Sequence, residues 1–301
     1  MKIRRVGAYG LCRDGDGRVL LARGSMTSEF PGSWTLPGGG VDQGEHPDDA
    51  VVREFEEETG LSVRVTALHQ VTADVVRLPS GPLQHSDRII YAVVGTGGVL
   101  RDEVGGSTDR VAWAGPAERA SWPLLPWTAR LLGRDVPDAP FETDSSEILR
   151  RPDRVQRFGT YAVATDPAGR VLLAKIAPGY PGVGRWHLPG GGTDYGEKPE
   201  QALERELVEE TSQHGRVTGL VQISNHHDPA AIGPERVPVD WHVIRALYRV
   251  LIDEPTAAVV TETAGGSTQE AGWFTLEEAS KLPLTEIARS AVRSLMVETV
   301  S

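Results

Sequence analysis

The sequence has a single cysteine, Cys12, among its 301 residues, so no disulfide can form within the chain. Disulfides persist in oxidising compartments, and a chain without them is typical of the reducing cytoplasm. Long apolar runs are also missing: no stretch approaches the roughly 18 residues that a membrane-spanning helix needs, and the N-terminus lacks the apolar run of a secretory signal. We therefore expect a cytoplasmic protein with no membrane partner.

Positive charge is scarce as well. The chain carries 31 basic and 42 acidic residues, and its formal net charge is −11. Binding to a nucleic acid polymer requires a basic surface that neutralises phosphates, so such a polymer is not an expected partner. The same negative field disfavours small anionic ligands unless Arg, Lys or metal ions reverse it locally.

The chain contains an internal repeat that covers most of its length. The segment "GRVLLA" at 17–22 returns at 169–174, and "LPGGG" at 36–40 returns at 188–192, both at an offset of 152. The segment "GGST" at 105–108 returns at an offset of 160, so the second half has eight extra residues, which we place in 225–242. Each half is large enough to bury a core. We predict two domains, over 1–140 and 150–301, joined by a linker near 134–154.

Each half has the same predicted pattern of strands and helices. In the first half, residues 3–12 and 18–23 are typical of a hairpin around the turn "DGDG". A glycine-rich loop, a helix over 47–59, strands near 63–72 and 88–95, and a last helix before Gly133 follow. Strands interspersed with two helices predict an α/β or α+β sandwich.

The helix predicted over 47–59 concentrates negative charge on one face. The i, i+3, i+4 spacing of Glu54, Glu57 and Glu58 returns in Glu206, Glu209 and Glu210. Three carboxylates on one face destabilise a helix by a few tenths of a kcal/mol per pair, unless a cation offsets the repulsion. Magnesium is held by carboxylates, waters and substrate phosphates. A solvated, charge-rich helix explains one copy, but the same spacing in both copies favours a metal site.

Residues around this helix complete the pattern. The glycine-rich loop lets backbone approach a ligand closely, and a carbonyl there can become a further metal ligand. Glu45 is placed to meet Arg53 across the loop. Pro47 suits the first turn of the helix, Gly60 suits its C-cap, and Phe55 is expected to face the core.

Together these residues resemble the signature of the Nudix hydrolases, G-x5-E-x7-R-E-U-x-E-E-x-G-U, where U is a bulky apolar residue. The box at 39–61 matches every fixed position, whereas the box at 191–213 departs at its end, where Ser212 and Gln213 replace the Gly and the apolar residue. The resemblance implies an α/β fold class, with two Nudix-type α/β/α sandwiches with mixed sheets in tandem. It also implies Mg²⁺- or Mn²⁺-dependent hydrolysis of a diphosphate linkage in a nucleoside diphosphate-X or nucleoside triphosphate-like small molecule.

The resemblance also assigns roles to individual residues. The implied metal ligands are Gly38, Glu54, Glu57 and Glu58 in the first box, and Gly190, Glu206, Glu209 and Glu210 in the second. The implied catalytic residues are Arg53, Glu54, Glu57, Arg205, Glu206, Glu209 and Glu270. Glu270 lies three residues before Trp273, where the family often carries a late acid and where the first half has Arg110 beside Asp109. A box carboxylate, or one on a later loop, would orient the attacking water.

Three functions stay open at this point: a hydrolase, a Nudix-fold ligand-binding or sensor protein, and a chain with one catalytic half and one binding or structural half. Complete Arg-Glu and Glu-Glu pairs in both boxes favour the hydrolase. The complete first box predicts that the first site is the more active and that the second retains metal binding. Pairing of the two Nudix domains within the chain and a homodimer are both consistent with the sequence.

Other candidate residues carry weaker signals. Base stacking and core packing are both open for Trp34 and Trp186, which precede the glycine loops. Tyr9 is expected to pack in the sheet. The segment His226-His227-Asp228 is expected on a loop surface, and Cys12 is expected to be a small buried residue.

Overall fold

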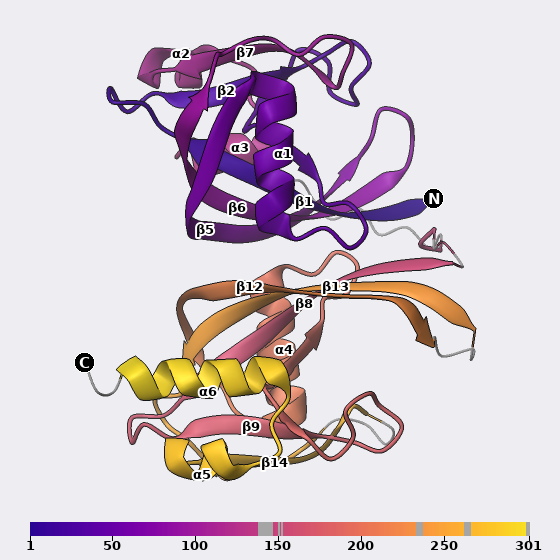
Figure 1. The fold of residues 1–301 in the computed structure, drawn as a ribbon, viewed down its shortest axis with the longest axis vertical. Coiled ribbons are helices and arrows are strands. Elements are labelled where there is room, and N and C mark those ends of the chain that lie inside the picture. The colour runs from indigo at the N-terminus through magenta and orange to yellow at the C-terminus, as the bar shows by residue number, and fades with distance from the viewer. Residues whose placement is uncertain (138–146, 150, 152, 233–236, 262–265, 299–301) are drawn as a thin grey trace. The chain divides into compact units, whose positions relative to one another are not determined.

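The computed structural model describes residues 1–137, 147–149, 151, 153–232, 237–261 and 266–298. The chain folds into two compact units, of which the first comprises residues 1–156 and 225–243, and the second residues 157–224 and 244–301. Each unit contains one of the two glutamate-rich helices (Figure 1). Among the described helices, none is long and apolar enough to cross a membrane. The segment between the predicted domains lies mostly outside the described residues, so those boundaries stay a prediction.

The first copy of the repeat forms two sheets. Its elements are β1 (Lys2–Cys12), β2 (Val19–Gly24), β3 (Trp34–Thr35), β4 (Gly38–Gly40), α1 (Pro47–Thr59), β5 (Leu61–Arg77), β6 (Leu83–Gly98), β7 (Thr108–Ala114), α2 (Pro116–Ser121) and α3 (Pro126–Leu131). One sheet has the order β4-β1-β6-β5 and is mixed, because β1 and β6 run parallel whereas β4 and β5 run antiparallel to their neighbours. The other sheet has the order β3-β2-β7 and is antiparallel.

The predicted hairpin over 3–12 and 18–23 was wrong in its pairing. Both strands form, and the turn between them closes with the Gly17 amide donating to the Asp14 carbonyl at 3.0 Å. However, β1 and β2 meet only at one isolated bridge between Arg13 and Val19, and each then enters a different sheet. Alternating apolar residues predict a strand but leave its partner open, because any strand edge can supply the hydrogen bonds.

Successive residues of β1 face the two helical layers of the first unit. An ideal Cβ built on Gly10 would lie 2.4 Å from the Phe55 ring of α1, so this face of the strand lies directly against that helix. Leu11 faces the opposite way and belongs to a buried cluster that contains Trp127 of α3. The helices α1 and α3 therefore cover opposite faces of the sheet, which is the α/β/α sandwich that the sequence predicted (Figure 1).

The second copy of the repeat has the same order of elements. They are β8 (Arg154–Thr165), β9 (Val171–Ile176), β10 (Trp186–His187), β11 (Gly190–Gly192), α4 (Pro199–Thr211), β12 (Arg216–Ile232), β13 (Pro238–Leu251), β14 (Thr268–Phe274), α5 (Leu276–Lys281) and α6 (Glu286–Glu298). The strand order is β10-β9-β8-β13-β12, with β11 on β8 and β14 on β9. In the second unit, Val163 of β8 packs in one buried cluster with Ala288, Val292 and Leu295 of α6.

The eight extra residues of the second copy are not confined to 225–242. The pattern His85-x-x-Arg88-x-x-Tyr91 in β6 returns as His242-x-x-Arg245-x-x-Tyr248 in β13, at an offset of 157. The His and Tyr side chains of both patterns are buried to 2% exposure or less. Five extra residues therefore precede this pattern and three follow it. The exposed His226 and His227 lie in strand β12, not in the loop that the sequence predicted.

Candidate functional site

Arg53 of α1 joins the glycine loop to the acidic face of its helix. Its Nε and Nη2 donate to the two carboxylate oxygens of Glu45, each at 2.9 Å, and Nη2 also donates to the Gly40 carbonyl at 3.1 Å. Its Nη1 donates to Glu54 at 2.9 Å and to Glu57 at 3.3 Å. The predicted contact between Glu45 and Arg53 is thus confirmed. The hydrogen bonds from Arg53 to Glu45 and Glu54 hold its pKa well above the ordinary value.

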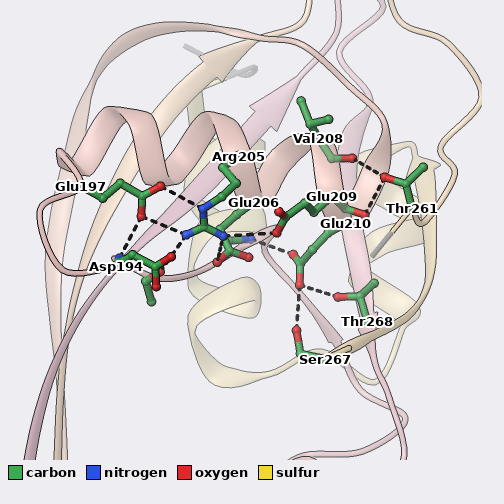
Figure 2. Close-up of polar contacts among 12 residues, drawn as sticks. Asp194, Glu197, Arg205, Glu206, Val208, Glu209, Glu210, Thr261, Ser267 and Thr268 are labelled. Carbon is green, nitrogen blue, oxygen red and sulfur yellow. Dashed lines mark hydrogen bonds and ion pairs between the residues drawn. The ribbon is translucent and has the colours of Figure 1, made fainter. Parts of the chain in front are cut away.

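The second box reproduces this network around Arg205 (Figure 2). Arg205 donates to Glu197 at 2.9 and 3.0 Å, to the Gly192 carbonyl at 3.2 Å, to Glu206 at 2.8 Å and to Glu209 at 3.2 Å. Each distance differs from its counterpart in the first box by no more than 0.1 Å. The two halves therefore hold the same constellation of one guanidinium and three carboxylates.

Both helices end in a left-handed residue, although only the first has glycine there. Gly60 has a φ of 72° and donates its amide to the Glu56 carbonyl at 3.0 Å. Ser212 has a φ of 55°, which costs a non-glycine residue roughly 1 kcal/mol. Its hydroxyl offsets part of that cost by donating to the Val259 carbonyl at 2.8 Å. Ser212 therefore serves as the cap of α4.

Gln213 replaces the apolar anchor of the second box with hydrogen bonds. The residue is 2% exposed. Its Nε2 donates to the Thr256 hydroxyl at 2.8 Å and to the Ala257 carbonyl at 3.2 Å, and its Oε1 accepts from the Thr256 amide at 3.0 Å. The second box departs from the family signature at Ser212 and Gln213, but these contacts hold the end of α4 in place.

The last glutamate of each box points into the protein. Glu58 and Glu210 are each 4% exposed, and each accepts a hydrogen bond at 2.9 Å from the amide of the first glycine of its loop, Gly38 or Gly190. Burial in a low-dielectric environment disfavours the charged carboxylate. It raises the pKa of Glu58 to about 8 and the pKa of Glu210 to about 7.

The two buried carboxylates differ in their further partners. Glu210 also accepts from the Ser267 hydroxyl at 3.1 Å and from the Thr268 hydroxyl (Figure 2). These donors stabilise its charged form and lower its pKa, whereas the negative charge of Glu103 raises the pKa of Glu58 further.

Glu54 and Glu57 lie at the outer side of the same helix face. The carboxylate of Glu54 rests on Gly39, where an ideal Cβ would lie 2.5 Å from it, so a side chain at position 39 would displace this carboxylate. The side chain of Glu57 is 53% exposed, and that of its counterpart Glu209 is 44% exposed. One carboxylate of each box is therefore partly enclosed and another is open to solvent.

This donor set fits a hard divalent cation, although it is not yet a formed metal centre. Across the described residues, no three His, Cys, Asp or Glu side chains converge to hold an ion. The cause is visible in the first box, where Glu54 and Glu57 turn to Arg53, and Glu58 turns inward to Gly38. Carboxylates on one helix face, beside a loop where only glycine fits, are nevertheless suitable oxygen donors. A cation would compete with the guanidinium for Glu54 and Glu57.

The raised pKa of Glu58 gives a testable dependence of stability on pH. A carboxyl group with a folded pKa of about 8 keeps its proton where the unfolded chain, with an ordinary pKa near 4.5, has lost it. The free energy of unfolding therefore falls as pH rises from about 4.5 to about 8. Glu58→Gln keeps an oxygen for the Gly38 amide and cannot ionise. We expect it to raise the melting temperature by several degrees at about pH 8 and by much less at about pH 4.5.

Calorimetry in excess chelator measures this difference without bound metal. Glu57→Gln, on the same helix but half exposed, is the matched control, because it removes a carboxylate that is not buried. An equal shift for Glu58→Gln at both pH values would contradict the buried, protonated state of Glu58.

The late acid Glu270 has a counterpart in the first half. Glu270 of β14 lies opposite Lys175 of β9 and accepts from its ammonium at 3.2 Å. In the first half, Asp109 sits at a bulge in β7 and accepts from Arg23 of β2 at 2.8 Å. The sequence comparison indicated that the first half lacks this acid, because Arg110 holds the aligned position. The structure corrects this, since an adjacent residue supplies the carboxylate.

Glu103 is an acid near the first box whose position the sequence alone did not reveal. Its carboxylate accepts from the amide and hydroxyl of Thr108, at 3.0 and 2.9 Å, and its charge reaches the buried Glu58. Alignment on "GGST" puts Thr263 at this position in the second copy, outside the described residues. The only sign of Glu103 in the sequence was an acidic residue shortly before the segment "GGST".

The remaining candidate residues belong to the core. Trp34 is 5% exposed and stacks on Trp122, with ring centroids 4.1 Å apart. Trp186 is 7% exposed and meets Phe274 edge-on at 4.8 Å. Core packing, not base stacking, therefore explains both tryptophans. Cys12 is buried, as predicted.

Comparison with known proteins gives one family and several relatives. The family model of the NUDIX domain matches residues 1–132 and 155–295. The sequence is 38% identical to an ADP-ribose pyrophosphatase of Methanocaldococcus jannaschii over 86 residues, which are 29% of this chain and 48% of that protein. It is 34% identical to the putative 8-oxo-dGTP diphosphatase 3 of Mycobacterium tuberculosis over 128 residues, 40% of this chain and 58% of that protein. The chain thus spans about half the length of these curated relatives.

Among solved structures, a MutT NUDIX hydrolase from Burkholderia pseudomallei has 28% sequence identity to this chain and a TM-score of 0.37. The match covers 46% of this chain and 97% of that one.

Proposed function

Because the chain belongs to the NUDIX domain family, which its two halves match separately, we propose that it is a pyrophosphohydrolase. Its substrate is a nucleoside diphosphate-X or a nucleoside triphosphate-like small molecule, and its cofactor is Mg²⁺ or Mn²⁺. Water attacks one phosphorus of the diphosphate, the bond from that phosphorus to the bridging oxygen breaks, and the leaving phosphate keeps the electron pair. Its relatives include an ADP-ribose pyrophosphatase, a putative 8-oxo-dGTP diphosphatase and a nucleoside triphosphatase, and these support this substrate class.

The observation that carries the proposal is the duplicated guanidinium–carboxylate network. Arg53 and Arg205 each fix two carboxylates of their own helix and one from the loop before it. Networks of this kind also stabilise a fold, but each one leaves a half-exposed carboxylate, Glu57 or Glu209, beside an enclosed one on the same helix. The networks hold the carboxylates in place for a cation, and this role explains why both boxes have the network.

The residues of each box take separate roles in this proposal. Glu54, Glu57, Glu58 and the Gly38 carbonyl hold the cation in the first half, and Glu206, Glu209, Glu210 and the Gly190 carbonyl do so in the second. The arginines are positioning residues that set the carboxylate orientation. A bound divalent cation would neutralise phosphate oxygens and make the phosphorus easier to attack.

The two sites are proposed to differ in how the attacking water is held. In the first half, Glu103 adds a carboxylate near Glu58 that is suited to accept the proton of the water, whereas the aligned residue of the second copy is Thr263, beside Glu262. In the second half that role falls to a box carboxylate or to Glu270. This difference supports the first site as the more active one. We assign the domains to 1–140 and 150–301 and the protein to the cytoplasm.

A substrate panel tests the proposal. Purified full-length protein is incubated with ADP-ribose, nucleoside triphosphates and dinucleoside polyphosphates, with and without Mg²⁺, and the products are separated by liquid chromatography. Metal-dependent release of a nucleoside monophosphate, or of phosphate or diphosphate, is the expected result. Tight binding of a panel member without any cleavage would favour the ligand-binding alternative.

A further inference from the structure

The loop between β4 and α1 of the first unit has two sides with different partners. Asp42 and Glu45 are bonded to each other: the Asp42 amide donates to the Glu45 carboxylate at 2.9 Å, and the Glu45 amide donates to the Asp42 carbonyl at 3.0 Å. Glu45 also accepts two hydrogen bonds from Arg53. This side of the loop therefore adjoins the guanidinium that orients the carboxylates of α1.

The other side of the loop faces residues that the second copy of the repeat supplies. Residues 225–232 of β12 and 238–243 of β13 form the second-copy segment, which belongs to the first compact unit. Gln43 of the loop donates from Nε2 to the Asp240 carbonyl at 3.0 Å and to the Asp240 carboxylate at 3.1 Å. The same carboxylate bonds to the His227 ring at 2.7 Å. Asp240 thus ties the loop to both strands of the segment.

Gly44 of the loop fits closely against the same segment. It has a φ of 83°, and an ideal Cβ on it would lie 2.6 Å from Nδ1 of His227, so the ring rests where a side chain does not fit. The Gly44 amide donates to Nδ1 of His242 at 3.2 Å, and the Gly44 carbonyl accepts from Asn225 at 3.5 Å. Both backbone polar groups of this residue are therefore paired with the segment.

A comparison of the two copies shows why the segment can bind the loop. In the first copy, Asp87 of β6 pairs with Arg4 of β1 at 2.9 Å and lies 3.4 Å from His85. Asp87 and His85 are both fully buried. The histidine and the arginine of the first copy thus have a charged partner within that copy.

The second copy lacks this acid. Ile244 stands at its position, and Gln156 replaces the arginine, at offsets of 157 and 152. Gln156 donates to the Val41 carbonyl of the loop at 2.9 Å. Burial lowers the pKa of His242, the counterpart of the first-copy histidine, to about 4, so its ring is neutral near neutral pH and Nδ1 can accept from the loop. The substitutions turn a closed charged cluster into polar groups that bond to the loop of the first box.

These contacts matter because the geometry of the box depends on the loop. Surface loops are usually more mobile than the helices and strands that they connect. The side chains of Glu45 and Arg53 are 16% and 31% exposed, and a partly exposed ion pair contributes little rigidity by itself. Metal ligation needs carboxylates that are held to within about 0.5 Å. The hydrogen bonds to Val41, Gln43 and Gly44 restrict the loop from the side opposite the ion pair.

We propose that the second-copy segment positions the first box, with Gln43 and Asp240 as the positioning residues that join the two. The segment fixes the loop and, through the ion pair between Glu45 and Arg53, the orientation of the carboxylates on α1. The proposal rests on the hydrolase function proposed above. It gives the second copy of the repeat a task in the first site that does not depend on the second box.

Hydrogen exchange and Mn²⁺ binding test this role without turnover. Exchange of the backbone amides of residues 41–46 is followed by mass spectrometry in excess chelator, and Mn²⁺ affinity is measured by electron paramagnetic resonance. All proteins are full length and carry Glu209→Gln, which weakens the second box. Gln43→Ala and Asp240→Ala are each expected to speed up exchange in the loop and to weaken Mn²⁺ binding at the first box about 3- to 10-fold, the effect of losing a hydrogen bond.

Two controls separate positioning from charge and from folding. Asp240→Asn keeps an oxygen that accepts from Gln43, and it is expected to retain most of the affinity. Asp228→Ala removes a carboxylate of the same segment that accepts from the Ala230 amide, and it is expected to leave both measurements unchanged. Gln43→Ala leaves the segment itself intact, so it decides the question even if Asp240→Ala fails to fold.

The outcomes distinguish this role from the hydrolase function. Exchange and Mn²⁺ affinity in Gln43→Ala and Asp240→Ala that match those of Asp228→Ala would overturn the positioning role. Such a result combined with metal-dependent turnover of the substrate panel would leave the hydrolase intact. Faster exchange and weaker Mn²⁺ binding in both variants, without turnover of any panel member, would instead support the positioning role and contradict the hydrolase.

Discussion

Replacing Glu57 and Glu209 together by Gln is expected to lower turnover at least about 10-fold in total, and to leave the fold unchanged. Each substitution removes a charged oxygen ligand and retains the shape of the side chain. The amide oxygen of Gln still accepts from Arg53 or Arg205, and the exposed position of both residues keeps the cost in stability near 0.5 kcal/mol or less. The loss therefore reports on metal-assisted chemistry.

The single variants divide the activity between the two halves. Glu57→Gln is expected to remove the larger share, because the first half also has Glu103 near its box. Glu56→Gln is the matched control, since Glu56 is the exposed neighbour on the same helix and lies outside the i, i+3, i+4 face. A double variant as active as the unchanged protein would exclude a catalytic role for both helices.

Removal of divalent metal is expected to have the largest effect, a loss of about 100-fold or more in turnover. Without a cation, the negative charges of a diphosphate would face the acidic face of α1 unopposed, since Arg53 is already bound to Glu45, Glu54 and Glu57. The chain has a net charge of −11, so its overall field adds to the repulsion.

This loss is measured by initial rates in excess chelator and after Mg²⁺ or Mn²⁺ is restored. Recovery of the rate by added metal separates loss of the cation from denaturation, and circular dichroism monitors the fold throughout. Full turnover in excess chelator would contradict the metal-dependent account.

Much of the site could be predicted from the sequence, because its chemistry depends on spacing along one helix. Glu54, Glu57 and Glu58 share a face for any helix over these residues, and Phe55 lies beside that face and is fully buried. The cap at Gly60 and the contact between Glu45 and Arg53 also follow from short-range geometry. The repeat strengthened each inference, because the second copy tests the same spacing with different neighbours.

The features that the sequence missed depend on contacts between distant residues. Gln213 replaces the apolar residue of the signature, and the sequence did not show that it bonds to Thr256, 43 residues further along the chain. The acid that reaches Arg23 is Asp109, which sits at a bulge in β7, while Arg110 holds the register position opposite Arg23. Pairing of β1 with β6 instead of β2 is also a choice of partner that local patterns do not encode.

The sequence could not predict that Glu58 and Glu210 are buried, for a related reason. All three glutamates of a box are equally polar, and helix geometry alone places them on one face. The fold distinguishes them: the last one faces an amide of the glycine loop, and the one before it stays in solvent. Burial thus raises the pKa of one carboxylate in each box, and differences in environment are the usual way in which one fold gives similar side chains separate roles.

The most direct test of the account is the fate of solvent oxygen during turnover. The full-length protein is supplied with Mg²⁺ and the most active member of the nucleotide panel in oxygen-18-labelled water, and the products are analysed by mass spectrometry. The account predicts one labelled oxygen on a single phosphate-bearing product, because water attacks phosphorus and the bond to the bridging oxygen breaks. Label in a product without phosphorus, or no metal-dependent cleavage of any panel member, would contradict it.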